Sequence, residues 1–324
     1  MPLISVIIAA YNGEKTIVET INSVLNQTHQ DLEIIAIDDG SSDNTRQLIQ
    51  DIADDRVKLF PYQNGGVAKA RNRGLSHVRG DYVCFLDHDD LWTEDKLAKQ
   101  VAALERSLDA GAAYSQTTNM YSEDEPTRYV PSPEVHFEGD VYQDILLSNF
   151  VGSGSNIMVR REAVESVGEF DPVPTSNEDW DYYIRLAAKW HFVVVPEYQI
   201  IYRHTANSMS SQVQRLADGG VILANKVFKS APENLQHLKN NFLFNHLAYC
   251  AELYLENYNN SHGQDRKSLI KAYRTMADAL RYSPSAIAKT STLKVILKLM
   301  SVTVLPSALV KQLKKMKHQI FKFT

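Results

Sequence analysis

Short apolar segments alternate with segments of helical periodicity over the first 120 residues, and this alternation restricts the fold more than any other feature of the sequence. Apolar runs of strand length occur at 3–10, 32–38, 57–60, 82–86 and 112–120. Segments with helical spacing or with helix-start residues such as Thr93 lie at 14–26, 41–52, 65–77 and 93–108. Strands that alternate with such helices predict an α/β fold, with a mostly parallel, Rossmann-like sheet and helices on both faces.

The pattern changes twice further along the chain. Residues 121–139 are rich in Pro, Ser and Glu and are expected to form a loop, whereas 140–205 return to mixed α/β character. After residue 211 the apolar residues follow helical spacing only. We therefore expect an α/β domain at 1–210 and an all-helical region at 211–324.

The composition restricts the class of protein. Two cysteines, Cys84 and Cys250, are too few for a disulfide framework or a four-cysteine zinc site, and they indicate reduced thiols in a cytoplasmic protein. The net charge of −5 argues against a nucleic-acid partner that would cover the whole surface. Since no run approaches the ~20 apolar residues of a transmembrane helix, we expect no membrane span.

The charge is distributed unevenly along the chain. Residues 281–324 contain Arg281, eight lysines and no acid, so this segment carries +9 and the rest of the chain carries −14. From Ser291 onward the lysines are mixed with large apolar residues, which favours peripheral contact with an anionic membrane on its cytoplasmic face. An ordinary terminal helix with a solvated basic face is the alternative. The helices after residue 211 are also candidates for oligomer contacts.

Acidic clusters directly follow two of the predicted strands, at the strand ends where open α/β sheets bind ligands. Asp39, after the run 32–38, can accept hydrogen bonds from a base or ribose, or can simply form a strand-to-helix turn. Asp87 and Asp89 follow the run 82–86, and carboxylates at alternate positions can converge on one hard cation such as Mn²⁺ or Mg²⁺. His88, between them, is expected to face outward as a spacer.

Two further segments open predicted helices. Asn64, Gly65 and Gly66 precede a helix that carries Lys69 and Arg71, where backbone N–H groups and basic side chains can approach an anion. The second segment begins with Glu178, Asp179 and Trp180. Its acids can complement the helix dipole or supply a general base, and the indole can form a wall beside a sugar ring or belong to the core.

Taken together, these segments resemble a family 2 glycosyltransferase of the GT-A fold. The matching segments, in the order usual for that family, are SVIIAAYNGEKTI at 5–17, EIIAIDDGSSDNT at 33–45, NGGVAKARNRGL at 64–75, GDYVCFLDHDDLW at 80–92 and NEDWDYYIRLA at 177–187. The resemblance covers about residues 3–210. It implies a metal-dependent, inverting enzyme that moves a hexosyl or N-acetylhexosaminyl group from a nucleoside-diphosphate sugar, with UDP first, to an acceptor hydroxyl. Such an enzyme would act in cell-surface polysaccharide or glycan synthesis, on a glycan or lipid-linked acceptor.

The resemblance also implies roles for individual residues. The nucleotide sugar would contact Ala9, Tyr11, Asn12, Asp39, Asn64, Lys69, Arg71, Asp87, His88 and Arg203. Asp89 would be the direct metal ligand, with Asp87 as the second member of the pair and nearer the ribose. Asp179 would be the general base, and Glu178 is the second choice for that role. Trp180 and Gly152 would lie on the acceptor side.

One departure from the family pattern concerns the metal. Relatives often carry Tyr-Arg-x-His after the last strand, whereas this chain has Tyr202-Arg203-His204-Thr205, so the histidine comes one position early. Two competing interpretations stay open at this point. A nucleotidyltransferase also uses an α/β sheet and aspartate-bound metal, but does not need the segment at 178–180. An inactive sugar-nucleotide-binding scaffold is the other, and the complete acidic set argues against it.

Overall fold

The computed structural model describes residues 1–121, 126–174, 176–204, 212–261 and 263–304. The chain divides into two compact units, Met1–Ser208 and Met209–Thr324, and each is described by itself. The strands of the first unit are β1 (Ile4–Ala10), β2 (Leu32–Asp38), β3 (Val57–Pro61), β4 (Tyr82–Asp87), β5 (Leu91–Trp92), β6 (Ala110–Tyr121), β7 (Arg128–Pro131), β8 (Met158–Arg160) and β9 (His191–His204). Its helices are α1 (Ile17–Leu25), α2 (Thr45–Gln50), α3 (Val67–Leu75), α4 (Lys96–Arg106), α5 (Tyr142–Leu147), α6 (Arg161–Val167) and α7 (Glu178–Ala187).

These strands form one mixed sheet with the order β3-β2-β1-β4-β8-β6-β9-β5, and β7 pairs with β6 beside it. The pairs β2–β3, β1–β2 and β1–β4 are parallel, as the βα alternation predicts. The short strands β5, β7 and β8 pair antiparallel with their neighbours, whereas β6 and β9 are parallel. The sheet is therefore Rossmann-like in its first half and mixed in its second half.

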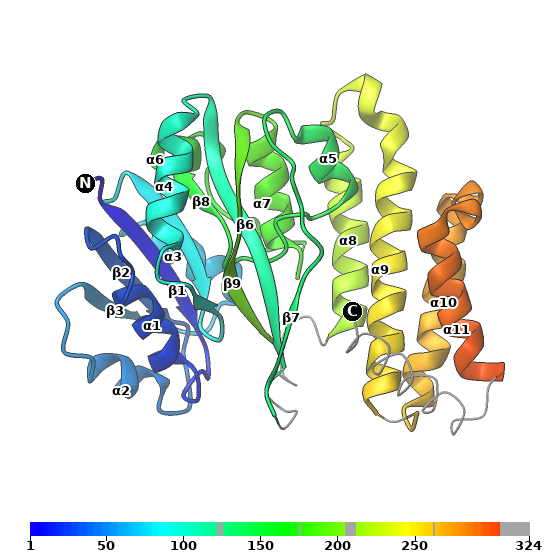
Figure 1. The fold of residues 1–324 in the computed structure, drawn as a ribbon, viewed down its shortest axis with the longest axis horizontal. Helices are drawn as coiled ribbons and strands as arrows, with labels where there is room; N and C mark the ends of the chain where they lie inside the picture. The colour runs from blue at the N-terminus through cyan, green and yellow to red at the C-terminus, as the bar shows by residue number, and fades with distance from the viewer. Residues whose placement is uncertain (122–125, 175, 205–211, 262, 305–324) are drawn as a thin grey trace, which may run out of the picture. The chain divides into compact units, whose positions relative to one another are not determined.

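Helices lie on both sides of this sheet, and β1 is therefore buried at every position (Figure 1). On one side, Val6 and Ile8 of β1 belong to a core cluster with Ile21 of α1 and Leu97 of α4. The periodicity of α1 and α4 therefore matches the face that each helix buries.

The opposite side of the sheet is covered by α3 and α7. A methyl group at Gly74 of α3 would lie 2.4 Å from Ile7, so a glycine is needed for the helix to approach β1 this closely. The ring of Phe85 in β4 makes an edge contact with Tyr182 of α7, at 6.0 Å between ring centroids. This contact holds the first turn of α7 near the end of β4.

The register of the parallel strands gathers their carboxyl ends at one edge. Ala10 at the end of β1 pairs with Asp38 at the end of β2, and Ala9 pairs with Asp87 at the end of β4. The loops after these three strands therefore leave the sheet side by side, at the edge where α/β proteins bind ligands.

Two details of the first unit differ from the sequence predictions. The segment 121–139 was expected to be a loop, but Arg128–Pro131 form β7 against β6; this strand is short and exposed, so its periodicity is weak. Thr93 was expected to cap the following helix. Instead α4 begins at Lys96, and the Thr93 hydroxyl donates to Asp95 Oδ1 at 2.9 Å.

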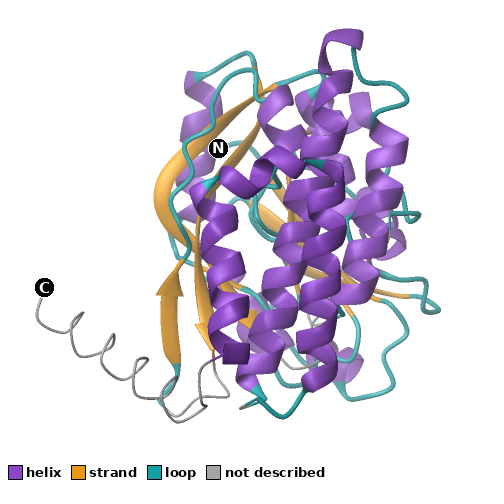
Figure 2. Ribbon diagram, turned by 90° about the vertical axis from the view of Figure 1, so that its right-hand side faces the viewer, coloured by secondary structure: helices purple, strands orange, loops and turns teal. Residues whose placement is uncertain are grey.

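The second unit contains helices and connecting loops among its described residues (Figure 2). They are α8 (Val213–Val227), η2 (Glu233–Leu238), α9 (Lys239–Asn260), α10 (Arg266–Tyr282), η3 (Pro284–Ala288) and α11 (Thr290–Val304). Its core includes Cys250 and Tyr254 of α9 with Ala272 and Met276 of α10, at helical spacing of four residues. In the described part of the chain, no helix has both the length and the apolar character needed to cross a bilayer.

Candidate active site

An ion pair between α3 and β4 lies at the carboxyl edge of the sheet. Arg71 Nη2 donates to Asp87 Oδ1 at 2.7 Å. Arg71 is buried, and a methyl group at Gly154 would lie 2.1 Å from the same Nη2, so the glycine makes room for the guanidinium. The other nitrogen, Nη1, is buried and has no hydrogen-bond partner among the described residues.

The first turn of α7 brings two more acids to this guanidinium. Burial lowers the pKa of Arg71, but the negative charges of Asp87, Glu178 and Asp179 outweigh that effect, so the pKa is raised. The sequence alone predicts only that these residues lie at the ends of separate strands and helices. The structure brings them into one cluster of three acids around one buried cation.

The two acids of α7 are held in less ionised states than free carboxyl groups. Burial, with a smaller contribution from Asp179, raises the pKa of Glu178 to about 7. Burial also raises the pKa of Asp179, although the positive charge of Arg71 acts in the opposite direction. Asp179 is partly exposed, and its carboxylate accepts the Trp180 N–H at 2.7 Å and the Asn149 amide at 3.4 Å. Asp179 is therefore the more accessible of the two acids.

The turn after β4 carries the remaining acids. Burial raises the pKa of Asp89, and the nearby charge of Asp87 adds to this effect. A divalent cation would offset this concentration of negative charge, and carboxylate oxygens suit a hard cation that keeps water or phosphate as its other ligands. The donor set of Asp87 and Asp89 therefore fits Mn²⁺ or Mg²⁺. Within the described ranges, no group of three or more His, Cys, Asp or Glu side chains is arranged to hold a metal.

Asp39 lies at the end of β2, where its carboxylate organises the neighbouring loop. It accepts the Gly65 N–H at 3.0 Å, the Gly66 N–H at 2.7 Å and Arg73 Nη1 at 2.6 Å. The Asn64 amide donates to the backbone oxygen of Asp39 at 3.0 Å. Asp39 therefore anchors the loop before α3, and its expected contact with uracil or ribose stays a prediction.

The predicted nucleotide residues of the β1–α1 loop divide into exposed and structural ones. Tyr11 is 47% exposed, whereas Ala9 is buried in β1. Asn12 has a positive φ of 51°, and its side-chain oxygen accepts the Ser42 N–H at 2.8 Å. Asn12 thus connects the loops after β1 and β2, whereas the Tyr11 ring is an exposed aromatic group of this loop.

Two other predicted nucleotide residues differ in their surroundings. The ring of His88 lies so close to Gly13 that a methyl group there would be 2.3 Å from His88 Cδ2. The expectation that His88 is an outward-facing spacer is therefore wrong, because its ring packs against the β1–α1 loop. Lys69 is exposed on α3, in the same helix as the buried Arg71.

The acceptor-side residues also need one correction. Trp180 is buried, and its indole Nε1 donates to the Ile145 carbonyl of α5 at 2.7 Å. The expectation that it forms a wall beside a sugar ring is wrong, because this side chain belongs to the core. Gly152 is exposed with φ +91°, and its N–H donates to Asn149 Oδ1 at 3.3 Å. Asn149 therefore links Gly152 to Asp179, because its side chain bonds to both residues.

The end of β9 holds the acidic turn in place. Arg203 Nη2 donates to Glu19 Oε2 at 2.7 Å, and its Nε donates to the Asp89 carbonyl at 2.9 Å. Arg203 is 9% exposed and holds the turn through these bonds, and its expected contact with the nucleotide sugar stays a prediction. Its backbone N–H donates to the buried Asp90 Oδ1 at 3.0 Å.

The ring of His204 is held by side chains of β6. Its Nε2 lies 2.9 Å from Asn119 Oδ1, and its ring stacks on Tyr121 with 4.4 Å between centroids. Burial lowers the pKa of His204, so the neutral ring is favoured. Thr205, which takes the usual place of the metal-shell histidine, lies outside the described residues.

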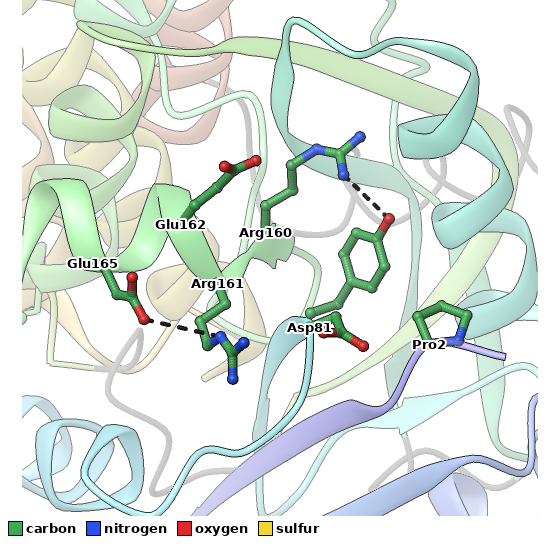
Figure 3. A pocket seen from close by; sticks show the side chains of 7 residues that line it. Pro2, Asp81, Arg160, Arg161, Glu162 and Glu165 are labelled. Atoms are coloured by element: carbon green, nitrogen blue, oxygen red, sulfur yellow. Dashed lines mark hydrogen bonds and ion pairs between the residues drawn. The ribbon is translucent and has the colours of Figure 1, made fainter.

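A hollow of about 390 Å³ lies at the opposite, amino ends of β1 and β4 (Figure 3). Its lining includes Pro2, Asp81, Arg160 and Glu162. The Arg160 guanidinium already donates to the Tyr82 hydroxyl at 3.3 Å and to two backbone carbonyls. The hollow is therefore remote from the acids at the carboxyl edge. The Arg160 guanidinium in it has few N–H groups left to bind a ligand.

Sequence reasoning missed four residues of the carboxyl-edge site. Arg73 contacts Asp39, Asn149 contacts Asp179, and Ser155 contacts Asp90. Asp90 adjoins a recognised motif, so its position in the acidic run was the available signal. The other three act through bonds between segments distant in sequence, which no local pattern reveals.

Comparison with known proteins identifies the family. Residues 5–168, half of the chain, match the profile of glycosyl transferase family 2. The chain therefore belongs to glycosyl transferase family 2, which confirms the resemblance found in its sequence.

Two curated relatives match part of the chain. TuaG of Bacillus subtilis (strain 168), provisionally named a teichuronic acid biosynthesis glycosyltransferase, is 36% identical over 167 residues, covering 50% of this chain and 63% of that protein. The UDP-Glc:alpha-D-GlcNAc-diphosphoundecaprenol beta-1,3-glucosyltransferase WfgD of Escherichia coli is 42% identical over 103 residues, covering 32% and 41%. The chain thus spans less than two thirds of the length of these relatives.

Solved structures share the fold over most of the chain. The mannosyltransferase PcManGT from Pyrobaculum calidifontis, solved with GDP-Man and Mn²⁺, has a TM-score of 0.60 at 20% identity, covering 94% of this chain and 86% of that chain. S. aureus TarS has a TM-score of 0.59 at 17% identity, covering 93% and 54%. The predicted GT-A type α/β fold, followed by a helical C-terminal region, is confirmed.

Proposed function

We propose that this chain is an inverting glycosyltransferase that moves a sugar from a nucleoside-diphosphate sugar to an acceptor hydroxyl. The observation that carries the proposal is the cluster around Arg71, where Asp87, Glu178 and Asp179 meet at the carboxyl edge of the sheet. The unit Met1–Ser208 would be the catalytic domain expected at 1–210, and the helical unit would be its C-terminal region. Family membership supports the class of reaction.

Asp179 is the general base in this proposal. It lies at the start of α7 and is partly exposed, and its raised pKa makes it a better proton acceptor than an ordinary aspartate. As the acceptor oxygen attacks the anomeric carbon, Asp179 takes the hydroxyl proton and the bond to the nucleoside diphosphate breaks. Glu178, with a pKa of about 7, would be a second ionisable group beside Asp179, and each would influence the titration of the other.

Arg71 has two roles in the proposed reaction. Through Nη2 it orients Asp87, and through its positive charge it favours the ionised form of Asp179. Its buried Nη1, without a partner among the described residues, is a donor that an oxygen of the sugar nucleotide can satisfy. The loop anchored by Asp39 and the exposed ring of Tyr11 would bind the base and ribose.

Asp89 and Asp87 would hold a divalent cation, Mn²⁺ or Mg²⁺. When bound, the cation supplies Lewis-acid stabilisation of the charge that develops on the nucleoside diphosphate. The chemistry of the donor set supports this assignment, since two adjacent carboxylates, one with a raised pKa, favour a cation with remaining water and phosphate ligands. His204 would take no part, because its ring is held by Asn119 and Tyr121.

The proposed donor is a UDP-sugar, and the proposed acceptor is a glycan or a lipid-linked sugar of cell-surface polysaccharide synthesis. The name of WfgD supports both, since it states a UDP-Glc donor and a diphosphoundecaprenol acceptor for that protein. S. aureus TarS 1–349, solved in complex with UDP-GlcNAc, shares this fold at 19% identity and a TM-score of 0.53, which supports a UDP-sugar donor.

The test uses the full chain with UDP-, dTDP- and GDP-sugars, with and without Mn²⁺. A donor at 100 times its Kd should stabilise the protein by about 2.7 kcal/mol, and that donor should then be hydrolysed or transferred. Asp179→Asn should lower turnover about 10²–10⁴-fold while donor affinity stays within about threefold. Asp31→Asn, an exposed acid outside the site, is the matched control. Full turnover by Asp179→Asn would reject the base assignment, and no donor binding by the folded protein would favour the inactive scaffold.

We further propose that the helical unit places the enzyme at an anionic membrane on its cytoplasmic face. On α11, Leu293, Leu297 and Met300 form an exposed apolar stripe, while Val295 and Leu299 are buried on the other side. Lysines flank this stripe, and the segment from residue 281 onward has no acid. Flotation with vesicles containing anionic lipid at low salt tests the contact, with Leu293→Ser/Leu297→Ser as the variant. Equal flotation of variant and wild type would reject it.

A further inference from the structure

The segment from Asn149 to Asn156 contacts three parts of the candidate site: Asp179, Arg71 and the turn after β4. At one end the Asn149 amide reaches Asp179, and at the centre Gly154 makes room for Arg71. The Ser153 carbonyl accepts the Tyr183 hydroxyl of α7 at 2.9 Å. At the other end Ser155 meets the turn after β4. One short segment therefore contacts both the proposed base and the turn that carries the proposed cation ligands.

Ser155 makes the connection to the acidic turn through its hydroxyl. The Oγ donates to Asp90 Oδ2 at 2.5 Å and accepts the Asp87 N–H at 3.1 Å. Asp90 in turn accepts the Arg203 N–H of β9 on its second oxygen at 3.0 Å. The hydroxyl thus ties both ends of the turn, whose two middle residues are His88 and Asp89.

The backbone around Ser155 is itself firmly held. The Ser155 carbonyl accepts Trp92 Nε1 at 2.8 Å, and the Asn156 carbonyl accepts the Gln100 side chain at 3.1 Å. The Asn156 side chain bonds to the backbone of Ser115 in β6, accepting its N–H at 2.8 Å. Ser155 is fully buried. Because the backbone of Ser155 is held in place, its hydroxyl can fix the position of the turn.

We propose that Ser155 is a positioning residue that holds the turn with Asp87 and Asp89 in the arrangement needed for a divalent cation and a nucleoside diphosphate. The inference rests on the proposed function of the site. Ser155 touches neither substrate nor cation; it acts through Asp90 and through the backbone of Asp87. Residues that orient carboxylate ligands in this way commonly change metal affinity 10–100-fold when they are removed.

The structure supplies a matched control at the opposite end of the same sheet. Ser5 is also fully buried and donates to a buried carboxylate, Glu33 Oε1, at 2.7 Å. It accepts two backbone N–H groups, that of Gly80 at 2.8 Å and that of Arg79 at 3.2 Å. Ser5→Ala therefore removes the same kinds of bond as Ser155→Ala, and one more backbone bond, at the other end of the sheet. Any general loss of stability should be at least as large in Ser5→Ala.

The experiment measures the binding of Mn²⁺ and UDP to the full-length protein by electron paramagnetic resonance and calorimetry. Ser155→Ala should weaken Mn²⁺ binding about tenfold or more in the presence of UDP, whereas Ser5→Ala should stay within about twofold of wild type. Amide exchange should increase at 87–92 in Ser155→Ala and at 79–82 in Ser5→Ala. Equal Mn²⁺ affinity for the two variants would overturn the inference.

A double-mutant cycle tests the route through Asp90. In an Asp90→Asn background, the further change Ser155→Ala should alter Mn²⁺ affinity less than it does in wild type, because the hydroxyl has already lost its carboxylate partner and keeps only the Asp87 N–H. If each change lowered Mn²⁺ affinity tenfold regardless of the other, the route through Asp90 would be overturned.

If the wild-type protein binds neither Mn²⁺ nor UDP, the proposed function fails. The positioning role is then decided by amide exchange at 87–92, and unchanged exchange in Ser155→Ala would reject it.

Discussion

Arg71 Nη2 lies 2.7 Å from Asp87 Oδ1, and this pair joins the middle of α3 to the last residue of β4. The arginine side chain is 4% exposed and the aspartate side chain is 28% exposed, so the pair reaches from the interior to the surface of the site. Because Glu178 and Asp179 act on the same guanidinium, one buried positive charge balances acids from two elements.

We expect Arg71→Met to lower the free energy of unfolding by about 3 kcal/mol near pH 7, because it leaves three carboxyl groups without their cation. The loss should be smaller at pH 5, where Glu178 and Asp179 take up protons more readily. Urea unfolding at both pH values measures the effect. Lys69→Met, an exposed lysine of the same helix, should change stability by less than about 0.5 kcal/mol. A loss as large at pH 5 as at pH 7 would contradict the electrostatic explanation.

Asp39→Asn should destabilise the protein by about 2 kcal/mol, because an amide cannot accept the two backbone N–H groups and the arginine that the carboxylate accepts. The loop at 63–66 should loosen, and the KM for the donor should rise more than kcat falls. Asp38→Asn is a suitable comparison, since Asp38 is equally buried and accepts the Ser41 N–H at 3.0 Å. An unchanged KM for the donor in Asp39→Asn would show that the loop anchored by Asp39 does not contribute to nucleotide binding.

The raised pKa of Glu178 predicts a specific pH dependence of stability. The folded state holds this proton up to about pH 7, whereas the unfolded chain releases it near the ordinary value of 4.5. Stability is therefore greatest below pH 4.5 with respect to this group, and it declines as the pH rises to 7, by up to about 3 kcal/mol.

Glu178→Gln should remove that decline. Its unfolding free energy should exceed that of wild type by about 1–3 kcal/mol at pH 8 and match it more closely at pH 5. Thermal or urea unfolding across this range measures the difference, and Glu162→Gln, an exposed glutamate, should show no such trend. A parallel pH profile for wild type and Glu178→Gln would show that Glu178 titrates normally.

His204→Leu should leave the Mn²⁺ affinity within about twofold of wild type, because the ring is held by Asn119 and stacked on Tyr121. The loss of the stacked pair should cost about 1 kcal/mol of stability. Titration with Mn²⁺ and UDP, followed by thermal unfolding, gives both values. A tenfold loss of Mn²⁺ affinity would instead restore a metal-shell role for this histidine.

The sequence predicted the parts of the fold that depend on local pattern. Continuous apolar runs gave β1, β2 and β4 within one or two residues, because strands buried on both faces have no polar alternation to confuse the assignment. The short strands β5, β7 and β8 were missed, since two to four residues carry too little periodicity. Their positions depend on pairing with β9, β6 and β4 instead.

The site followed the same division. Motif spacing placed Asp39, Asp87 and Asp179 at the right strand and helix ends. Motif spacing could not show which side chains are engaged in hydrogen bonds within the protein. Trp180, for example, bonds to a backbone carbonyl in the core, and Arg203 bonds to Glu19. Such outcomes depend on the direction of each side chain and on distant partners, which residue spacing does not contain.

The parallel pairing of β6 with β9 joins Ala110 to His191 and Tyr121 to His204. Contacts between segments so far apart in the chain close late, because their loop entropy must be overcome first. A nascent chain that has completed β1 to β4 already has the loops proposed for the nucleotide. It still lacks α7 with its base and the arginine that secures the acidic turn. The order of synthesis therefore adds the proposed base and this arginine to the chain only after all of the loops proposed for the nucleotide.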